Sequence, residues 1–401
     1  MSRGILAAII ADDLTGAMDS AAPFVRRGLD VKVITAPAGI GAIGDDLPHV
    51  LAISTNTRHV SPEIAVPIVN KTVADLLKHD PELIIKKIDS TLRGNVVPEI
   101  VAAMRASGRA EVIVCPAVPA QGRSFIGGEV FINSVVLRDT PVGRDLRSPP
   151  PRNPLQDLFR AADPSLPVLA TTAGGLSVFS SAREGIYLLD AESGDDLMAL
   201  VRPVREKLKE VLFAGASGIT EALAETLFGP PRLTSAPLRP SGQALFVVGS
   251  LAPQAAAQIA RLLEANENAR VLELTENPAV NRAALQALAA SGETFSSLVI
   301  KPPCLSEHAV LDAEMLVREL ADCTAFYLER ARVGLLLATG GDTAEALLAR
   351  LDLRVVAIGG EVQPGIVHGM VDTPRGPLRL VTKAGGFGDD RLFCTILEYF
   401  Y

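Results

Sequence analysis

Short runs of hydrophobic residues alternate with longer amphipathic stretches along almost the whole of this 401-residue chain. A continuous apolar run is typical of a strand buried on both faces, and the stretch after most of these runs has helical spacing. This alternation predicts an α/β protein with mainly parallel sheets. The runs lie at residues 5–11, 31–35, 50–54, 83–87, 112–115, 168–171, 186–189 and 211–215, and then at 244–248, 271–274, 298–300, 335–339, 355–358 and 378–382.

The pattern is interrupted once, in a proline-rich segment at residues 230–240. Four prolines in this segment exclude a helix and disfavour a central strand. We therefore predict two α/β domains, residues 1–229 and 241–401, with this segment as the linker and a cleft between them. Residues 116–154 carry glycines, prolines and arginines with weak periodicity, so we expect an irregular stretch with a functional role there.

Composition narrows the function classes. The formal net charge of -8 disfavours general binding to nucleic acid or to an anionic membrane, because both need a basic face. No apolar run approaches the length of a membrane span. The cysteines are far apart, which indicates reduced, buried thiols in a cytosolic protein rather than a zinc site. They are Cys115, Cys304, Cys323 and Cys394.

Two familiar glycine motifs can be set aside. Residues 39–44 match the dinucleotide-binding pattern GxGxxG, but the next apolar run starts at about residue 50 and leaves no room for the helix that would hold a pyrophosphate. We expect a surface loop there. The Walker pattern GxxxxGK[ST] and the protein-kinase signatures do not occur in the sequence. A nucleotide site in this chain therefore needs another construction.

The apolar run at residues 335–339 offers such a construction, because it leads through Gly340 and Gly341 directly into a helical pattern. Asp342 or Thr343 would cap that helix, and the glycines would let a phosphate approach backbone N–H groups. A tight strand-to-helix turn without a ligand is the alternative explanation.

Two further turns strengthen the prediction of a phosphate site. Gly385 and Gly386 follow the run at 378–382, and Gly249 with Ser250 follows the run at 244–248. Turns at the carboxyl ends of strands in one open sheet converge on one crevice. We therefore predict that these turns bind the phosphates of a nucleotide together.

In the first half, charged and hydroxyl residues stand at strand ends. Asp12 and Asp13 follow the first run; two adjacent buried carboxylates repel each other unless something binds there, and the alternative explanation is that one of them caps a helix. Asp89, Ser90 and Arg93 follow the run at 83–87 and suit a polyhydroxy carboxylate, with a solvated loop as the alternative. Arg123, after the run at 112–115, is predicted to close the same site.

These motifs together resemble the four-carbon acid sugar kinase family. The resemblance spans nearly the whole chain and continues through Asn133 and the loop at Arg144 and Asp145. Its main segments are residues 10–17 (IADDLTGA), 87–94 (KIDSTLRG), 115–117 (CPA) with Gly122 and Arg123, 340–343 (GGDT) and 383–388 (KAGGFG).

The resemblance implies an N-terminal domain for the acid sugar, a C-terminal domain for ATP, and phosphorylation of a tetronate such as threonate, erythronate or 3-oxo-tetronate. We expect Mg²⁺ to bridge the phosphates, and Asp12 or Asp89 to accept the hydroxyl proton. The motif positions imply Asp12, Asp13, Asp89 and Arg93 at the substrate, and Ser250, Gly340, Gly341, Asp342, Thr343 and Gly386 at the nucleotide.

Two other functions stay open at this point. One is a non-catalytic protein that senses a sugar acid. The other is a different small-molecule enzyme, such as a dehydrogenase or an aldolase that uses a desolvated Lys87 or Lys301. The expected partners are a small sugar acid and ATP, without nucleic acid or membrane, and a homo-oligomer is left open.

Overall fold

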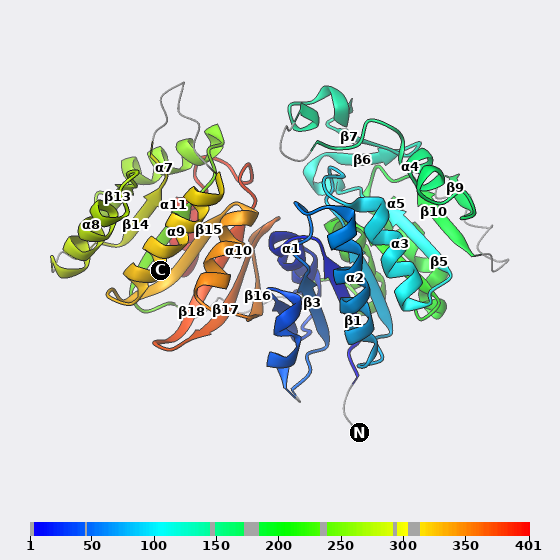
Figure 1. The fold of residues 1–401 in the computed structure, drawn as a ribbon, viewed down its shortest axis with the longest axis horizontal. Coiled ribbons are helices and arrows are strands. Elements are labelled where there is room, and N and C mark those ends of the chain that lie inside the picture. The colour runs from blue at the N-terminus through cyan, green and yellow to red at the C-terminus, as the bar shows by residue number, and fades with distance from the viewer. Residues whose placement is uncertain are drawn as a thin grey trace. The chain divides into compact units, whose positions relative to one another are not determined.

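The computed structural model describes residues 4–44, 46–144, 149–171, 184–232, 239–291, 295–303 and 313–401. The chain forms two compact units, Met1–Leu233 and Thr234–Tyr401. Each unit carries strands covered by helices (Figure 1), so the predicted α/β class with mainly parallel strands is confirmed. Residues 233–238 of the predicted linker lie outside the described residues.

The N-terminal unit is built on parallel strands whose order in the sheet is β2-β3-β1-β4-β11-β5-β10-β9. After β1 the chain builds the sheet toward β3 and β2, and then crosses to the other side of β1 to form β4. The gap between the ends of β1 and β4 is therefore a topological switch point, where ligands bind in open α/β sheets. The strands are β1 (Ala7–Ala11), β2 (Val31–Ile34), β3 (Val50–Ser54), β4 (Leu83–Lys87), β5 (Glu111–Cys115), β9 (Val168–Thr171), β10 (Gly185–Leu189) and β11 (Val211–Gly215).

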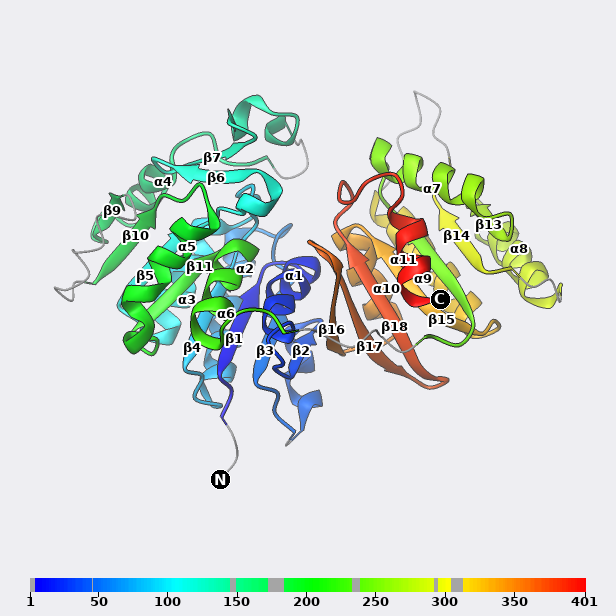
Figure 2. The ribbon, with the colours of Figure 1, turned by 180° about the vertical axis from the view of Figure 1, so that it is seen from behind.

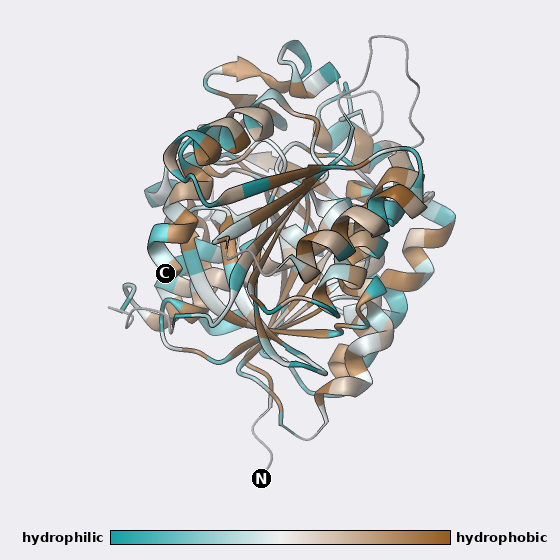
Figure 3. Cartoon of the chain, turned by 90° about the vertical axis from the view of Figure 1, so that its left-hand side faces the viewer, coloured by the Kyte–Doolittle hydropathy of each residue, from teal (hydrophilic) through white to brown (hydrophobic). Residues whose placement is uncertain are grey.

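Helices cover both faces of this sheet (Figures 1 and 2). One face is covered by α1 (Leu14–Val25), α5 (Gly194–Val201) and α6 (Ser217–Phe228), and the other by α2 (Pro62–Leu77), α3 (Val96–Ser107) and α4 (Leu155–Ala162). Every residue of β1, β3, β4, β5 and β11 is buried, which explains their mainly apolar sequences, although β4 ends in Lys86 and Lys87. The same contrast holds along the chain as a whole, and the hydropathy colouring of Figure 3 shows mainly hydrophobic strands beside helices with hydrophilic positions.

Two expectations for this unit are wrong. The stretch 116–154 contains an antiparallel sheet of β6 (Arg123–Ile126), β7 (Glu129–Ile132) and β8 (Val135–Val136), whose strands are too short to give a clear alternating pattern. Residues 145–148, which include Asp145 of the loop named above, lie outside the described residues.

The expected loop at 39–44 belongs to a 3₁₀ helix, Pro37–Ile43, whose first residue is a proline that fixes a helical φ angle.

The C-terminal unit has the strand order β13-β14-β12-β15-β18-β17-β16. The pairs from β13 to β18 are parallel, and its switch point lies between β12 and β15. Helices α7 (Pro253–Ala265) and α11 (Leu392–Phe400) cover one face, while α8 (Pro278–Ala290), α9 (Ala313–Leu328) and α10 (Gly341–Arg350) cover the other (Figures 1 and 2). The strands are β12 (Gln243–Val248), β13 (Ala269–Glu273), β14 (Ser297–Lys301), β15 (Val333–Thr339), β16 (Val355–Gln363), β17 (Ile366–Thr373) and β18 (Gly376–Lys383).

The strand predicted at residues 355–358 is longer than expected and does not lead into a helix. Strands β16, β17 and β18 form an antiparallel meander, and β17 had no counterpart in the predicted set. The connections carry Pro364-Gly365 and Pro374-Arg375-Gly376, with Gly365 at φ +79° and Gly376 at φ +108°. These are turn signals between strands.

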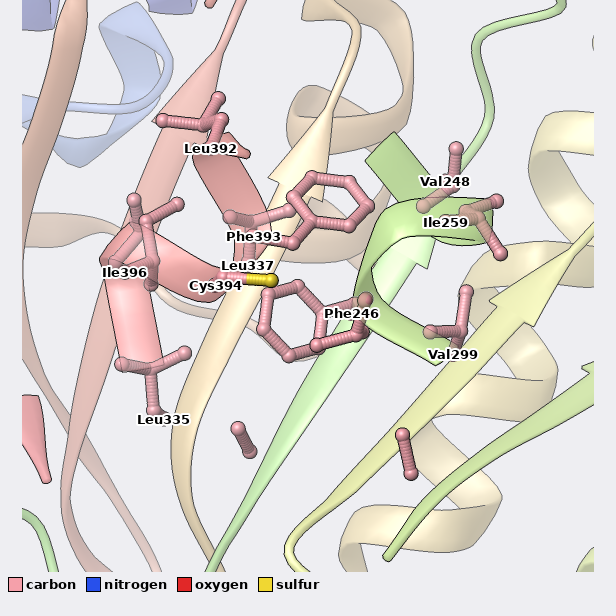
Figure 4. Close-up of a cluster of buried hydrophobic side chains, with 14 of the residues drawn as sticks. Phe246, Val248, Ile259, Val299, Leu335, Leu337, Leu392, Phe393, Cys394 and Ile396 are labelled. Carbon is pink, nitrogen blue, oxygen red and sulfur yellow. The ribbon is translucent and has the colours of Figure 1, made fainter. Parts of the chain in front are cut away.

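The core of the C-terminal unit holds α11 against β12 and β15 (Figure 4). The rings of Phe246 on β12 and Phe393 on α11 have centroids 4.9 Å apart. Buried Gln258 on α7 donates from Nε2 to the carbonyls of Phe387 (3.0 Å) and Asp389 (2.9 Å). The glycine-rich turn before α11 is therefore fixed to the packed body of the unit.

Two other expectations concern thiols and membranes. Cys115, Cys323 and Cys394 are free and buried, as predicted, while Cys304 lies outside the described residues. Among the helices of the described residues, none is both long and apolar enough to span a membrane.

Candidate functional site

The carboxyl end of β1 carries two adjacent carboxylates that are held by an arginine of the same unit. Asp13 is the N-cap of α1 and accepts a hydrogen bond from the Gly16 N–H group (3.0 Å). Arg58, in the loop after β3, donates from Nε and Nη2 to both oxygens of Asp12, each at 2.7 Å. Its Nη2 also donates to Asp13 Oδ1 at 2.7 Å. The repulsion between the two carboxylates is thus relieved by Arg58, which the sequence analysis did not identify.

Arg58 keeps Asp12 ionised although this carboxylate is almost removed from solvent. Burial is the largest effect on Asp12 and opposes its ionisation, but Arg58, Lys86 and Lys87 together lower its pKa below the ordinary value. The two carboxylates in turn raise the pKa of Arg58 well above its ordinary value, against the effect of burial. Asp12 is therefore a fixed anion at neutral pH.

The loop after β4 is organised around Asp89. Its Oδ2 accepts hydrogen bonds from Arg93 Nε (2.7 Å) and from the Thr91 hydroxyl (2.5 Å). Burial opposes ionisation of Asp89, but Arg58, Arg93 and the bond from Thr91 hold its pKa well below the usual range. The sequence placed Arg93 at a polyhydroxy carboxylate substrate, whereas in the structure its guanidinium engages Asp89, with a longer second bond of 3.3 Å.

The structure brings the other predicted residues of this half to the same place. Arg123, at the start of β6, donates from Nη1 to the hydroxyl of Ser90. Burial lowers the pKa of Arg123, although Asp89 and Asp19 favour its charge. Asp12, Asp13, Asp89, Ser90, Arg93 and Arg123 therefore all lie at the carboxyl edge of the sheet, on either side of the switch point.

Two further groups of this edge are Lys87 and Asp19. Lys87, the last residue of β4, donates to the carbonyl of Ile88 (2.9 Å). A Cβ atom on Gly16 would lie 3.1 Å from Lys87 Nζ, so any larger residue at this position would crowd the ammonium group. Burial raises the pKa of Asp19 above its ordinary value, against the attraction of Lys87 and a hydrogen bond with Ser217. The edge thus combines donors, acceptors and a carboxylate with raised proton affinity.

Three glycine-bearing turns meet at the carboxyl ends of β12, β15 and β18 in the C-terminal unit. A Cβ on Gly249 would lie only 1.9 Å from Thr343 Oγ1, and a Cβ on Gly385 would lie 2.5 Å from Ser250 Oγ. The Gly340 N–H group donates to the carbonyl of Lys383 (3.0 Å). The turns are therefore in direct contact, which needs glycine at these positions.

The start of α10 differs from the prediction. Gly340 is the N-cap, at φ +96°, and makes no side-chain capping bond; the helix begins at Gly341. Asp342 and Thr343 lie inside the first turn, so the expectation that one of them caps the helix is wrong. Thr343 is buried against Gly249, whereas Gly386 is exposed with no atom within 4 Å of an added Cβ.

Lys383, the last residue of β18, begins the KAGGFG segment but was not predicted as a site residue. Its ammonium group is fully buried and donates to the carbonyls of Ala384 (3.2 Å) and Gly385 (3.0 Å). Burial lowers its pKa to about 8. Its register partner on β15 is Thr339, whose buried hydroxyl has no hydrogen-bond partner in the described residues. A lysine just before a glycine turn was the sequence signal for it.

Within the described ranges, no three His, Cys, Asp or Glu side chains are grouped so as to hold a metal ion. Mg²⁺ at nucleotide sites is commonly held by phosphate oxygens, water and one or two carboxylates, so such an ion needs no group of this kind. Asp342 is a carboxylate in the first turn of α10, beside the glycine turns.

Comparison with known proteins gives matches over both units. Residues 7–223 match the family described as a sugar-binding N-terminal domain, and residues 245–393 match the nucleotide-binding C-terminal domain. D-threonate kinase of Salmonella typhimurium is 30% identical, covering 98% of this chain and 97% of the relative. D-erythronate kinase of Heliobacterium modesticaldum is 26% identical (98% and 96%), and 3-oxo-tetronate kinase of Cupriavidus necator 28% (96% and 94%).

Solved structures agree with this assignment. A Salmonella typhimurium protein provisionally labelled a tRNA synthase has a TM-score of 0.81 at 22% identity, covering 98% of this chain and 99% of its own; at that identity the likeness concerns the fold alone. A Bordetella bronchiseptica protein of unknown function, crystallised with citrate as a domain-swapped dimer, is 28% identical with a TM-score of 0.50 and 98% of each chain covered. The chain therefore belongs to the four-carbon acid sugar kinase family and is a phosphotransferase.

Proposed function

We propose that the enzyme transfers the γ-phosphate of ATP to a hydroxyl of a four-carbon sugar acid of the threonate, erythronate or 3-oxo-tetronate type. The observation that carries this proposal is the meeting of three glycine turns at the switch point of the C-terminal unit. Such turns leave backbone N–H groups open to a phosphate. The names of the relatives support the substrate class.

In this proposal the nucleotide phosphates lie over the C-terminal turns. Gly341, Gly385 and Gly386 offer backbone N–H groups, and the N-terminus of α10 contributes its dipole. Gly340 is proposed to let the phosphates approach this turn, while its own N–H group is bonded to the Lys383 carbonyl. The hydroxyls of Ser250 and Thr343 add donors. Mg²⁺ would be carried by phosphate oxygens, with Asp342 as the nearest predicted carboxylate, and would neutralise charge as the phosphoryl group leaves.

The N-terminal edge would hold the sugar acid. Arg123 and Lys87 offer cationic donors for the carboxylate of the sugar acid. Asp13, Ser90 and Arg93 are proposed to form hydrogen bonds with its hydroxyl groups. Asp12 and Asp89 stay proposed as the carboxylates at the reacting hydroxyl. Both are ionised by their arginine partners, which suits them to accept a hydrogen bond and orient the hydroxyl.

Asp19 is a further candidate for the proton acceptor. A general base works best with a pKa near the operating pH, and the pKa of Asp19 is raised whereas those of Asp12 and Asp89 are lowered. Asp19→Asn is therefore expected to lower kcat, with KM for the sugar acid changed little. An unchanged kcat would remove Asp19 from the reaction.

The other functions considered are less well supported. A Schiff-base lysine must be desolvated and free to react, but Lys301 is partly exposed and paired with Glu273 at 2.5 Å. A sugar-acid sensor would not need the paired glycine turns of the C-terminal unit. Kinase names among relatives matched over nearly full length also favour turnover over sensing.

The test is a coupled assay of ADP release with MgATP and a panel of D-threonate, L-threonate, D-erythronate and 3-oxo-tetronate. We expect ADP formation with one or more of these acids and little without an acceptor. Binding of a tetronate without any ADP release would support the sensor instead. Phosphorus NMR of the product then identifies the phosphorylated hydroxyl.

A further inference from the structure

Two lysines near the carboxyl ends of central strands have fully buried side chains, but their surroundings differ. Lys86 on β4 forms an ion pair with Glu99 at 2.8 Å, and both side chains are essentially inaccessible to solvent. Lys383 on β18 is equally buried, yet among the described residues its partners are the backbone carbonyls of Ala384 and Gly385 and not a carboxylate. A buried cation without an anion is costly, so a structural role alone does not explain Lys383.

The bonds of Lys383 determine the direction of the next two amide groups. The peptide bonds after Ala384 and Gly385 are trans, so the C=O and N–H groups of each point in opposite directions. Because both carbonyls face the Lys383 ammonium, the N–H groups of Gly385 and Gly386 face away from it. Within the described part of the chain, neither of these N–H groups donates to another protein group.

We infer that Lys383 is a positioning residue of the nucleotide site, which draws the carbonyls of Ala384 and Gly385 inward and aims the N–H groups of Gly385 and Gly386 at a phosphate. The inference rests on the proposed function. Because Lys383 is fully buried, it acts through the turn and not by touching the nucleotide. Its positive charge, just beneath the two amides, also favours an anion above them.

The position of the turn supports this role. Gly386 is exposed, and the space where its Cβ would lie is open. Ser250 Oγ lies against Gly385, and the Gly340 N–H group is bonded to the Lys383 carbonyl. Lys383 therefore joins the β15 and β18 turns through one residue, while Ser250 links the β12 turn to them.

The first test replaces the cation with a neutral side chain of similar length, Lys383→Met, and measures MgATP binding by calorimetry. We expect the affinity for MgATP to fall about ten-fold or more, because the variant loses one favourable positive charge and the hydrogen bonds that orient two amide groups. KM for ATP should rise more than kcat falls. The Tm should not fall, because removal of a buried charge also removes the cost of burying it. If Lys383 had only a structural role, the Tm of the variant would fall. An affinity equal to that of the wild type would overturn the inference.

A second variant tests the inference even if Lys383→Met does not fold. Gly386→Ala adds a methyl group beside an N–H aimed at the phosphate, and Gly194→Ala adds one at the start of α5 as a matched control. Neither glycine is in the left-handed region, and neither added Cβ meets an atom within 4 Å. Both variants should fold, and Gly386→Ala alone should lose MgATP affinity; equal affinities would contradict the inference.

These results are separable from the proposed function. If the wild-type enzyme does not bind MgATP, the proposed function fails and the inference fails with it. If the wild type binds MgATP and Lys383→Met binds it equally well, the proposed function stands and only the role of Lys383 is rejected.

Discussion

At the scale of single residues, the N-terminal edge depends on Arg58. One guanidinium forms ion pairs with both Asp12 and Asp13, and the Arg58 side chain is 10% exposed. Arg58→Met leaves two adjacent carboxylates with little solvent, which we expect to cost about 3 kcal/mol of unfolding free energy. Sugar-acid turnover should fall at least about a hundred-fold, since the carboxylates lose their fixed positions.

Urea unfolding and steady-state kinetics check this prediction. Arg105→Met is the matched control, because Arg105 pairs with Asp163 at the surface and its side chain is 63% exposed. Such a pair contributes only about 0–1 kcal/mol. Equal losses of stability in the two variants would show that Arg58 is not a buried anchor.

Arg58 also shows where prediction from sequence stops at this scale. The motif residues Asp12, Asp89 and Arg93 were identified because they stand next to predicted strand ends. Their partner Arg58 was not identified, because it is 46 positions from Asp12 and no local pattern joins the two residues. Asp19 lies inside α1 without any motif, and its importance comes only from Lys87 and Ser217 being folded against it.

At the scale of elements, the turn from β15 to α10 depends on the left-handed conformation of Gly340, at φ +96°. Gly340→Ala forces a side chain into a strained region and should cost about 1–2 kcal/mol of unfolding free energy. MgATP binding should weaken as well, because the N–H groups at the start of α10 move. Chemical unfolding and calorimetry measure both effects; unchanged values for both would contradict this account of the turn.

A second element, the β17–β18 hairpin, makes stability depend on pH through His368. Its ring lies against Arg379 and the ring of Phe400, and burial and Arg379 lower its pKa to about 4. In the unfolded chain a histidine has a pKa of about 6.5, so the unfolded state takes up the proton first as the pH falls. Stability should therefore drop by about 2 kcal/mol between pH 7 and pH 5.

Urea unfolding at the two pH values tests this prediction. His368→Asn cannot titrate in this range, so its pH dependence should be smaller by about the same amount. A variant with the same pH dependence as the wild type would assign the effect to other groups.

The strands themselves show how far the hydrophobic pattern reaches. Strands buried on both faces, such as β3 and β11, were located to the residue because they are apolar almost throughout. Several antiparallel strands were missed: β17 contains His368 and Gly369 at buried positions, and β6 to β8 have four residues or fewer. In such strands tertiary contacts, and not the local pattern, decide the structure.

At the scale of the whole molecule, the two units carry separate sets of site residues, each at its own switch point. Asp89→Asn should therefore abolish turnover while MgATP affinity stays within about two-fold of the wild type, since Asp89 belongs to the N-terminal unit. Calorimetry and the ADP assay on the same preparation measure the two effects. Near-normal turnover would exclude Asp89 from the reaction, and a large loss of MgATP affinity would contradict the division of roles between the units.

The central claim is that the C-terminal turns bind a nucleotide which the enzyme uses to phosphorylate a sugar acid. The most direct measurement titrates the wild-type enzyme with MgATP by calorimetry and then follows ADP release after addition of D-threonate, D-erythronate or 3-oxo-tetronate. The account predicts saturable MgATP binding and ADP formation that depends on the acid. No measurable affinity for MgATP, or ADP formation independent of every acid, would contradict it.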